Sequence, residues 1–170
     1  LFSVRDSAPR SLSSRAVEYY LESLAMKAEI GDDVTDVINT LVNIGAIYDA
    51  QGDSRLALDY YDRALAQLKQ HNTPDVTMIT VLNNMGHAET ALGDFAHARD
   101  HLTASLALAN KLGDAARSAT ASYNLSALAR TEGRLDEAER LSRETLAARE
   151  RGEDRIGLIE SLTDLSHVLD

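Results

Sequence analysis

The chain repeats one pattern of residues at intervals of 40 or 41 positions. Asn43 and Asn84 are 41 residues apart, and a further 40 residues lead to Asn124. The stretches that begin there read "NIGAIYDAQGDSRLALDYY", "NMGHAETALGDFAHARDHL" and "NLSALARTEGRLDEAERLS". A unit of this length cannot bury its apolar face alone, so successive units must stack. The period therefore predicts an elongated stack of similar units, not a globule around a single core.

Each unit has the residue pattern of two helices. Apolar residues recur at helical spacing in the first half, as in Ile38, Leu41 and Ile44. Glycine tolerates the left-handed backbone that often closes a helix, and helix ends are predicted at Gly52, Gly93 and Gly133. Asp53 and Asp94 follow as helix caps, and Arg134 departs from this pattern. Cap residues also recur at a second turn, at Asp32, Thr73, Asp114 and Asp154. These starts and stops predict about eight helices.

Small side chains recur where the two helices of a unit should cross. On the first helix they are Gly45, Gly86, Ser126 and Ser166; on the second they are Ala16, Ala57, Ala98 and Ala138. A large side chain at a crossing would push the two helices apart. Larger apolar residues form columns around the crossings: Leu24, Leu65, Leu106 and Leu146 on the second helix, and Ile44, Met85, Leu125 and Leu165 on the first.

The same frame divides the chain into a leading segment and one repeat domain. Residues 1–11 contain Pro9 and are predicted to be a linker or the frayed remnant of a helix. The repeat domain, 12–170, is predicted to contain a half repeat (12–31), three full repeats (32–72, 73–113 and 114–153) and a further half repeat (154–170). Because the chain begins at Leu1 and stops inside a first helix, we expect it to be a segment of a longer protein.

The columns resemble the tetratricopeptide repeat. That family has an Asn-Leu-Gly-like start, an aromatic residue three positions after the glycine, a Gly-Asp-like turn and two alanines seven apart; "NIGAIYDAQGDSRLALDYYDRAL" fits nearly every place. Other copies depart from it, with Glu89 and Ala129 at the Tyr48 place, and Leu102 and Ser142 at the Tyr61 place. The length of the repeat is similar to the long variety of bacterial regulators and signalling proteins. The resemblance implies an all-α, right-handed superhelical solenoid of antiparallel helix hairpins.

The resemblance also implies a concave groove lined by the first helices. In the family the asparagine column faces this groove, which implies that Asn43, Asn84 and Asn124 bond the backbone of an extended peptide. An amide offers both a donor and an acceptor, so it can satisfy a peptide unit. The alternative, that these side chains only brace neighbouring helices, stays open because buried polar groups need partners in either case. The same groove is expected to contain Asn39, Val42, Ala46, Asn83, His87, Tyr123, Ala127, Arg130, Asp164 and His167.

Composition and motifs narrow the function classes. A formal net charge of −10 disfavours binding to nucleic-acid phosphates and to anionic membranes. The absence of cysteine excludes disulfides and thiolate metal sites, and it fits a reducing cytoplasm. His97 and His101 are one helical turn apart, but no third metal ligand is evident, so a solvated helix face is predicted. No catalytic constellation, metal site or cofactor motif is found, and we expect no enzymatic activity.

The sequence therefore predicts a non-catalytic module that binds protein or peptide. Only Arg130 is available to hold a C-terminal carboxylate, which favours a grip on peptide backbone over a carboxylate clamp. The resemblance suggests the interaction or sensory segment of a larger bacterial cytoplasmic protein. The alternative is a self-association scaffold, in which exposed end helices stack on another copy and form a weak homodimer. The stripe expected there is Ile156, Ile159, Leu162 and Leu165.

Overall fold

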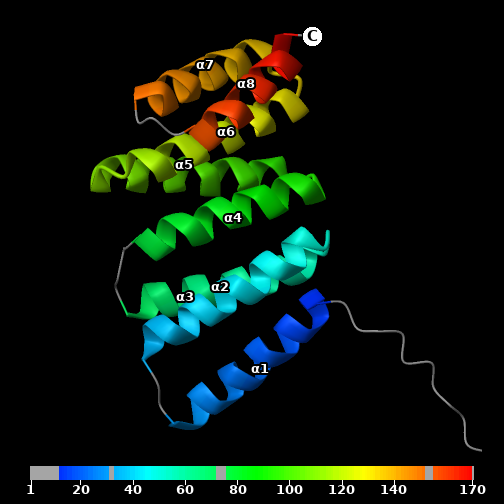
Figure 1. Cartoon of the computed structure of the whole chain (residues 1–170), viewed down its shortest axis with the longest axis vertical. Coiled ribbons are helices and arrows are strands. Elements are labelled where there is room, and N and C mark those ends of the chain that lie inside the picture. Colours follow the sequence, from blue (N-terminus) through cyan, green and yellow to red (C-terminus); the bar gives the residue numbers. More distant parts are fainter. Residues whose placement is uncertain (1–11, 31–32, 72–75, 152–154, 170) are drawn as a thin grey trace, which may run out of the picture.

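The computed structural model describes residues 12–30, 33–71, 76–151 and 155–169, which form eight helices (Figure 1). They are α1 (Leu12–Ile30), α2 (Val34–Ala50), α3 (Ser54–Gln70), α4 (Val76–Leu92), α5 (Phe95–Leu112), α6 (Ala115–Thr131), α7 (Leu135–Arg151) and α8 (Arg155–Leu169). No strand occurs in these ranges, and the prediction of an all-α chain of about eight helices is confirmed. The predicted linker, residues 1–11, lies outside the described residues.

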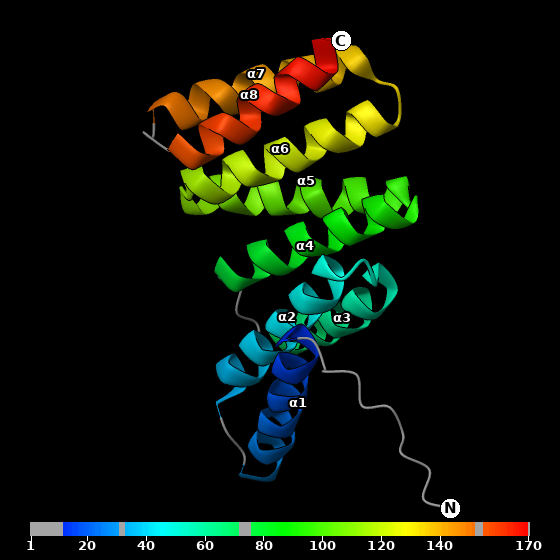
Figure 2. The same ribbon diagram turned by 45° about the vertical axis from the view of Figure 1, so that its right-hand side comes forward.

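The helices stack in chain order from α1 to α8 (Figures 1 and 2). The hairpins α2–α3, α4–α5 and α6–α7 pack most extensively, and each hairpin packs on the next. The backbones of α2 and α4 also approach closely, as do those of α4 and α6 and of α6 and α8. Within the described ranges no such approach joins α3 with α5 or α5 with α7. The stack therefore has an inner layer formed by α2, α4, α6 and α8, whose solvent-facing side we call the inner face.

The turns inside the hairpins are built as the sequence predicts. Gly52 and Gly93 have φ angles of +81° and +79° in the left-handed region. After each glycine, the next backbone N–H donates back across the turn, from Asp53 to the Tyr48 carbonyl at 2.9 Å and from Asp94 to the Glu89 carbonyl at 2.9 Å. These bonds satisfy carbonyls that the end of a helix leaves open. The predicted helix ends at these glycines are confirmed.

Aspartate caps begin three of the helices at the predicted places. The side chains of Asp53, Asp94 and Asp114 accept from backbone N–H groups in the first turns of α3, α5 and α6. The prediction for α2 was wrong by one residue. Its N-cap is Asp33, not Asp32, because the helix begins at the core-facing Val34 and the Asp33 carboxylate reaches the Thr35 N–H at 2.9 Å. The predicted caps Thr73 and Asp154 lie outside the described residues.

Arg134, which stands where the other hairpins have a capping aspartate, joins an ionic cluster instead. Its guanidinium pairs with Glu132 and Glu137. Arg99 of α5 reaches the same two carboxylates, at 2.5 Å from Glu132 and 3.2 Å from Glu137. A cationic side chain cannot accept from the N–H groups of a helix start, so Arg134 cannot replace the aspartate as a cap. The link between the two hairpins is made by Arg99.

The crossings of the hairpins are filled by matched pairs of side chains. A Cβ atom placed on Gly45 would lie 2.5 Å from Tyr61, and one placed on Gly86 would lie 2.5 Å from Leu102. At the equivalent crossing of α6 and α7 both members are serine, and their Oγ atoms are 2.6 Å apart. Glycine therefore faces a large residue and serine faces a small one, so neither kind of crossing is overpacked.

Candidate functional site

The asparagine column has partners within the chain. The side chain of Asn84 is hydrogen-bonded to Tyr61 of α3, and burial raises the pKa of Tyr61 well above its ordinary value. The Asn124 Nδ2 donates to Asn83 Oδ1 at 3.0 Å, which joins α6 to α4. Asn43 is exposed on α2, beside Tyr20 of α1 in an open hollow. Asn84 and the Asn83–Asn124 pair therefore brace neighbouring helices. The pair is only half-buried, and Asn43 is exposed.

Among the described residues, two of the four polar groups of the Asn83–Asn124 pair make no side-chain hydrogen bond. Each amide has an oxygen acceptor and an NH₂ donor, and the bond between them uses one of each. In the described part of the chain, the Asn83 NH₂ and the Asn124 oxygen make no other side-chain hydrogen bond. Turning both amides over would exchange these roles but would leave the same two groups. The pair thus offers one donor and one acceptor, the complement of a peptide unit.

A hollow of about 180 Å³ lies next to this pair, between α4 and α6. It is lined by Ile79, Thr80, Asn83, Asn84, Arg117 and Thr120. The two threonine hydroxyls donate to backbone carbonyls of their own helices, at 3.3 Å from Thr80 and 3.1 Å from Thr120. Their oxygens can still accept hydrogen bonds. The hollow is therefore a small recess at the centre of the inner layer, with hydrogen-bonding groups set in a largely apolar wall.

The other predicted groove residues are spread along the inner layer. Asn39 and His167 are exposed on α2 and α8, and Arg130 is half-buried on α6. Tyr123 lies under the Arg149 guanidinium, 5.5 Å from the ring centroid. His87 extends from α4 to α2, where its Nδ1 is 2.7 Å from Asp49. This partner could not be predicted from the repeat pattern, because the contact depends on how α2 and α4 face each other. The side chain of Asp164 lies outside the described residues.

A buried acid and a histidine form a further pair that the sequence analysis missed. His101 was predicted to lie on a solvated face, but its Nδ1 is 2.8 Å from Glu89, and the two side chains are only 24% and 8% exposed. The prediction fails because α4 packs against α5 at this point. The pair occupies the places of Tyr48 and Tyr60, whose rings stack with centroids 5.6 Å apart. Exposed His97 pairs instead with its helix cap, Asp94, at 2.8 Å.

Glu89 should make the stability of the fold depend on pH. Burial raises the pKa of Glu89, and the hydrogen bond and charge of His101 oppose this effect. The Glu89 carboxyl group therefore binds its proton more tightly in the folded state than in the unfolded state. The protonated group contributes to stability at low pH, and this contribution is lost as the pH rises through the folded-state pKa of Glu89. Each tenfold difference in proton affinity corresponds to about 1.4 kcal/mol.

The variant Glu89→Gln keeps the shape of the side chain but does not titrate. We expect its free energy of unfolding, relative to that of the native chain, to increase as the pH is raised from about 4 to about 7. Urea unfolding over this pH series would measure the difference. His97 is present in both proteins, and both keep Asp94, the main cause that raises the pKa of His97. A difference that is constant or decreases with pH would contradict the assignment.

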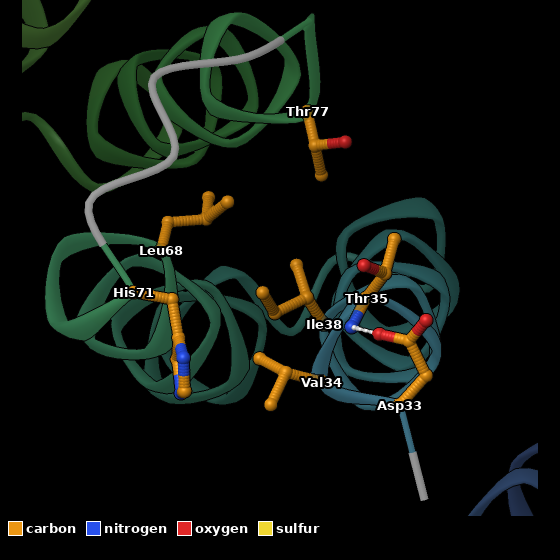
Figure 3. A pocket seen from close by; sticks show the side chains of 7 residues that line it. All are labelled: Asp33, Val34, Thr35, Ile38, Leu68, His71 and Thr77. Carbon is orange, nitrogen blue, oxygen red and sulfur yellow. Dashed lines mark hydrogen bonds between the residues drawn. The ribbon is translucent and has the colours of Figure 1, made fainter.

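Another hollow, of about 340 Å³, lies where the start of α2 meets the end of α3 (Figure 3). The Asp33 carboxylate accepts from the Thr35 N–H there, as the dashed line shows, so it serves as a helix cap. Val34, Ile38 and Leu68 supply an apolar wall. His71 is the C-cap residue of α3 and is exposed. The hollow is thus formed by helix-cap residues and apolar side chains at the edge of a hairpin. We assign no catalytic or binding role to it.

Two further properties bear on the class of site. Among the residues with described positions, no three histidine or carboxylate side chains are grouped so that they could hold a metal ion. None of the described helices is both long enough and apolar enough to cross a bilayer.

Solved structures share this architecture. BtubC from P. vanneervenii superposes with a TM-score of 0.83 at 21% sequence identity over 92% of this chain and 65% of that one. A Rap protein complexed with competence and sporulation factor superposes with a TM-score of 0.82 at 18% sequence identity. The match covers 92% of this chain and 43% of the Rap protein. The kinesin light chain repeats of Podosopora anserina superpose with a TM-score of 0.75 at 15% sequence identity. That match covers 92% of this chain and 76% of the other chain. The chain thus spans less than two thirds of BtubC and of Rap, and these likenesses establish the fold.

The family of the chain is identified from its amino-acid sequence. No curated protein sequence matches the chain. The family model described as tetratricopeptide repeat matches residues 14–70 and 77–151, which include all three hairpins except Val76, the first residue of α4. The hairpins, their glycine turns and the small residues at their crossings agree with that match. The chain is a member of the tetratricopeptide repeat family.

Proposed function

We propose that this chain is a non-catalytic module that binds protein or extended peptide on its inner face. Tetratricopeptide repeats are generally interaction modules without catalytic activity. We further propose that it is the interaction or sensory segment of a larger bacterial, cytoplasmic regulatory or signalling protein. The architecture shared with a Rap protein complexed with a factor, and with kinesin light chain repeats, supports a role in recognition.

The observation that carries the proposal is the Asn83–Asn124 pair. A peptide laid across α4 and α6 can donate its N–H to the Asn124 oxygen and accept from the Asn83 NH₂. Such contacts recognise the backbone and tolerate many sequences. The recess beside Asn83 adds Arg117 and two threonine oxygens, which would favour a polar side chain at that point of the peptide. His87 and Tyr123 lie on the same inner layer and would add side-chain preference.

Substitution of the pair separates binding from folding. Peptides selected by the native chain from a displayed random library serve as the probe. Asn83→Ala and Asn124→Ala each remove a partner of the bound peptide group, at a cost of about 1–3 kcal/mol. We expect each to weaken the binding of a selected peptide about 5- to 150-fold, with little change in melting temperature, because both side chains are only half-buried.

Asn84→Ala and Gln70→Ala are the matched amide controls. Asn84→Ala leaves the buried Tyr61 without its hydrogen-bond partner, so we expect the melting temperature to fall by several degrees. Gln70 is exposed on the outer helix α3, and its loss should change neither quantity. Selected peptides that bind Asn83→Ala and Asn124→Ala as tightly as the native chain would refute the proposed site.

A further inference from the structure

The recess beside the Asn83–Asn124 pair is lined by a single charged side chain among the described residues, that of Arg117 on α6. The Arg117 Nη1 is 2.6 Å from the Asp114 Oδ2, and within the described part of the chain Asp114 is its only ion-pair partner. This contact uses one of the several N–H donors of a guanidinium. The Asp114 carboxylate, which also caps α6 through the Arg117 backbone N–H, therefore holds the guanidinium at the recess and leaves donors for a further acceptor.

The polar groups of the recess distinguish ligand side chains by the sign of their charge. The hydroxyls of Thr80 and Thr120 already donate to backbone carbonyls, so they offer only acceptor oxygens. A cationic side chain could use these oxygens, but Arg117 would repel it. Among the described residues no carboxylate lines the recess, and the Asp114 carboxylate is engaged by the helix cap and by Arg117. An anionic side chain therefore meets an N–H donor of matching charge.

The arginine belongs to one step of the inner layer and not to the repeat. At the 40- to 41-residue offset the equivalents of Arg117 are Asp36 on α2, Thr77 on α4 and Gly157 on α8. The paired amides belong to the same step, because the equivalents of Asn83 and Asn124 in the preceding step are Val42 and Asn84. Two departures from the repeat, a cation and a pair of amides, thus coincide between α4 and α6.

The surroundings of the recess also favour an anion. The helices α4 and α6 contain Arg117 and Arg130, whereas their only carboxylate is that of Glu89, although the whole chain has a net charge of −10. Glu89 is buried and paired with His101. The wall of the recess is largely apolar, and a charge pair is stronger beside such a wall than in open water.

We propose that the recess receives an acidic side chain, aspartate or glutamate, of the peptide bound on the inner face. Its carboxylate accepts from the Arg117 guanidinium while the Asn83–Asn124 pair holds a neighbouring peptide unit. The volume of about 180 Å³ equals that of about six water molecules, which one acidic side chain can displace. This inference rests on the proposed function, because it specifies one residue of the same bound peptide.

The peptides selected from the random library should share an acidic residue at one position. We expect the native chain to bind such a peptide about 10-fold or more tightly than its analogue with the corresponding neutral amide. Arg117→Gln should remove this preference, and Arg117→Glu should make the analogue with lysine the tighter ligand. Titration calorimetry with the three peptides measures these ratios. Circular dichroism should be unchanged, because the Arg117 side chain is exposed.

Arg140→Gln is the matched control, because Arg140 is also an exposed arginine in an ion pair, with Glu144, but lies on the outer helix α7. It should keep the acid preference of the native chain. Asn83→Ala should weaken the acidic peptide and its amide analogue by the same factor, so the two contacts are measured separately. Selected peptides without a shared acid, or an acid preference that persists in Arg117→Gln, would refute this inference and leave the proposed function intact. A chain that selects no peptide would refute both.

Discussion

Replacing Gly86 and Leu102 together by serine is expected to cost less stability than the sum of the two single replacements. Gly86→Ser places a side chain against Leu102 and should destabilise by about 1–3 kcal/mol. Leu102→Ser removes a fully buried side chain and should cost about 2–5 kcal/mol through the cavity that it leaves. In the double variant the two changes offset each other, and we expect a coupling energy of about 1–3 kcal/mol.

The hairpin of α6 and α7 already contains the arrangement that this double variant copies. Ser126 Oγ donates to the Ala138 carbonyl at 3.0 Å and accepts from Ser142 Oγ at 2.6 Å. Urea unfolding of the native chain, the two single variants and the double variant gives the coupling directly. Gly45→Ser combined with Leu102→Ser is the control, because Gly45 faces Tyr61 in another hairpin and additivity is expected there. Additive effects at Gly86 and Leu102 would show that the two side chains do not determine the crossing.

His101→Leu alone is expected to be strongly destabilising, by about 3 kcal/mol at neutral pH. It removes the partner of the buried Glu89 carboxylate and leaves a charge without compensation. Adding Glu89→Ala should restore most of the loss, because the pair then has the residues of Ala129 and Leu141, which are both buried in the next hairpin without a charge. Replacing a buried ion pair by apolar residues is often neutral or stabilising.

Thermal and urea unfolding of the two single variants and the double variant would measure this recovery. His97→Leu is the matched control, since His97 is exposed and pairs only with the helix cap Asp94, and we expect little effect. The double variant should also lack the pH dependence that Glu89 gives to the native chain. A double variant as unstable as His101→Leu would mean that the site requires the charged pair.

The helix ends and the crossings could be predicted from the sequence because each is decided by local sterics. Gly52 and Gly93 stand where the backbone turns left-handed, and Gly86 stands where Leu102 leaves no room for a Cβ. The cap of α2 was misplaced because Asp32 and Asp33 are adjacent and both are suitable. The repeat period identifies equivalent positions in successive repeats, but it does not show which of two adjacent aspartates is the N-cap residue.

The contacts of the candidate site could not be predicted in the same way. Asn83 meets Asn124, and His87 meets Asp49, across two inner helices whose relative rotation the repeat pattern does not specify. The pair of Glu89 and His101 could have been found by comparing pairs of columns, because both members of the Tyr48–Tyr60 pair change in the same repeat. Such joint changes preserve a contact while its chemistry changes from aromatic to ionic.

The absence of close approach between α3 and α5, and between α5 and α7, among the described residues has a mechanical consequence. When the stack bends, the outer helices can move apart or together without losing direct packing against each other. The inner helices touch their successors and define the line about which the bending occurs. The stack should therefore be compliant in curvature and stiff within each hairpin. A partner that is too long or too short for the inner face at rest can be accommodated by elastic bending, with the hairpin cores intact.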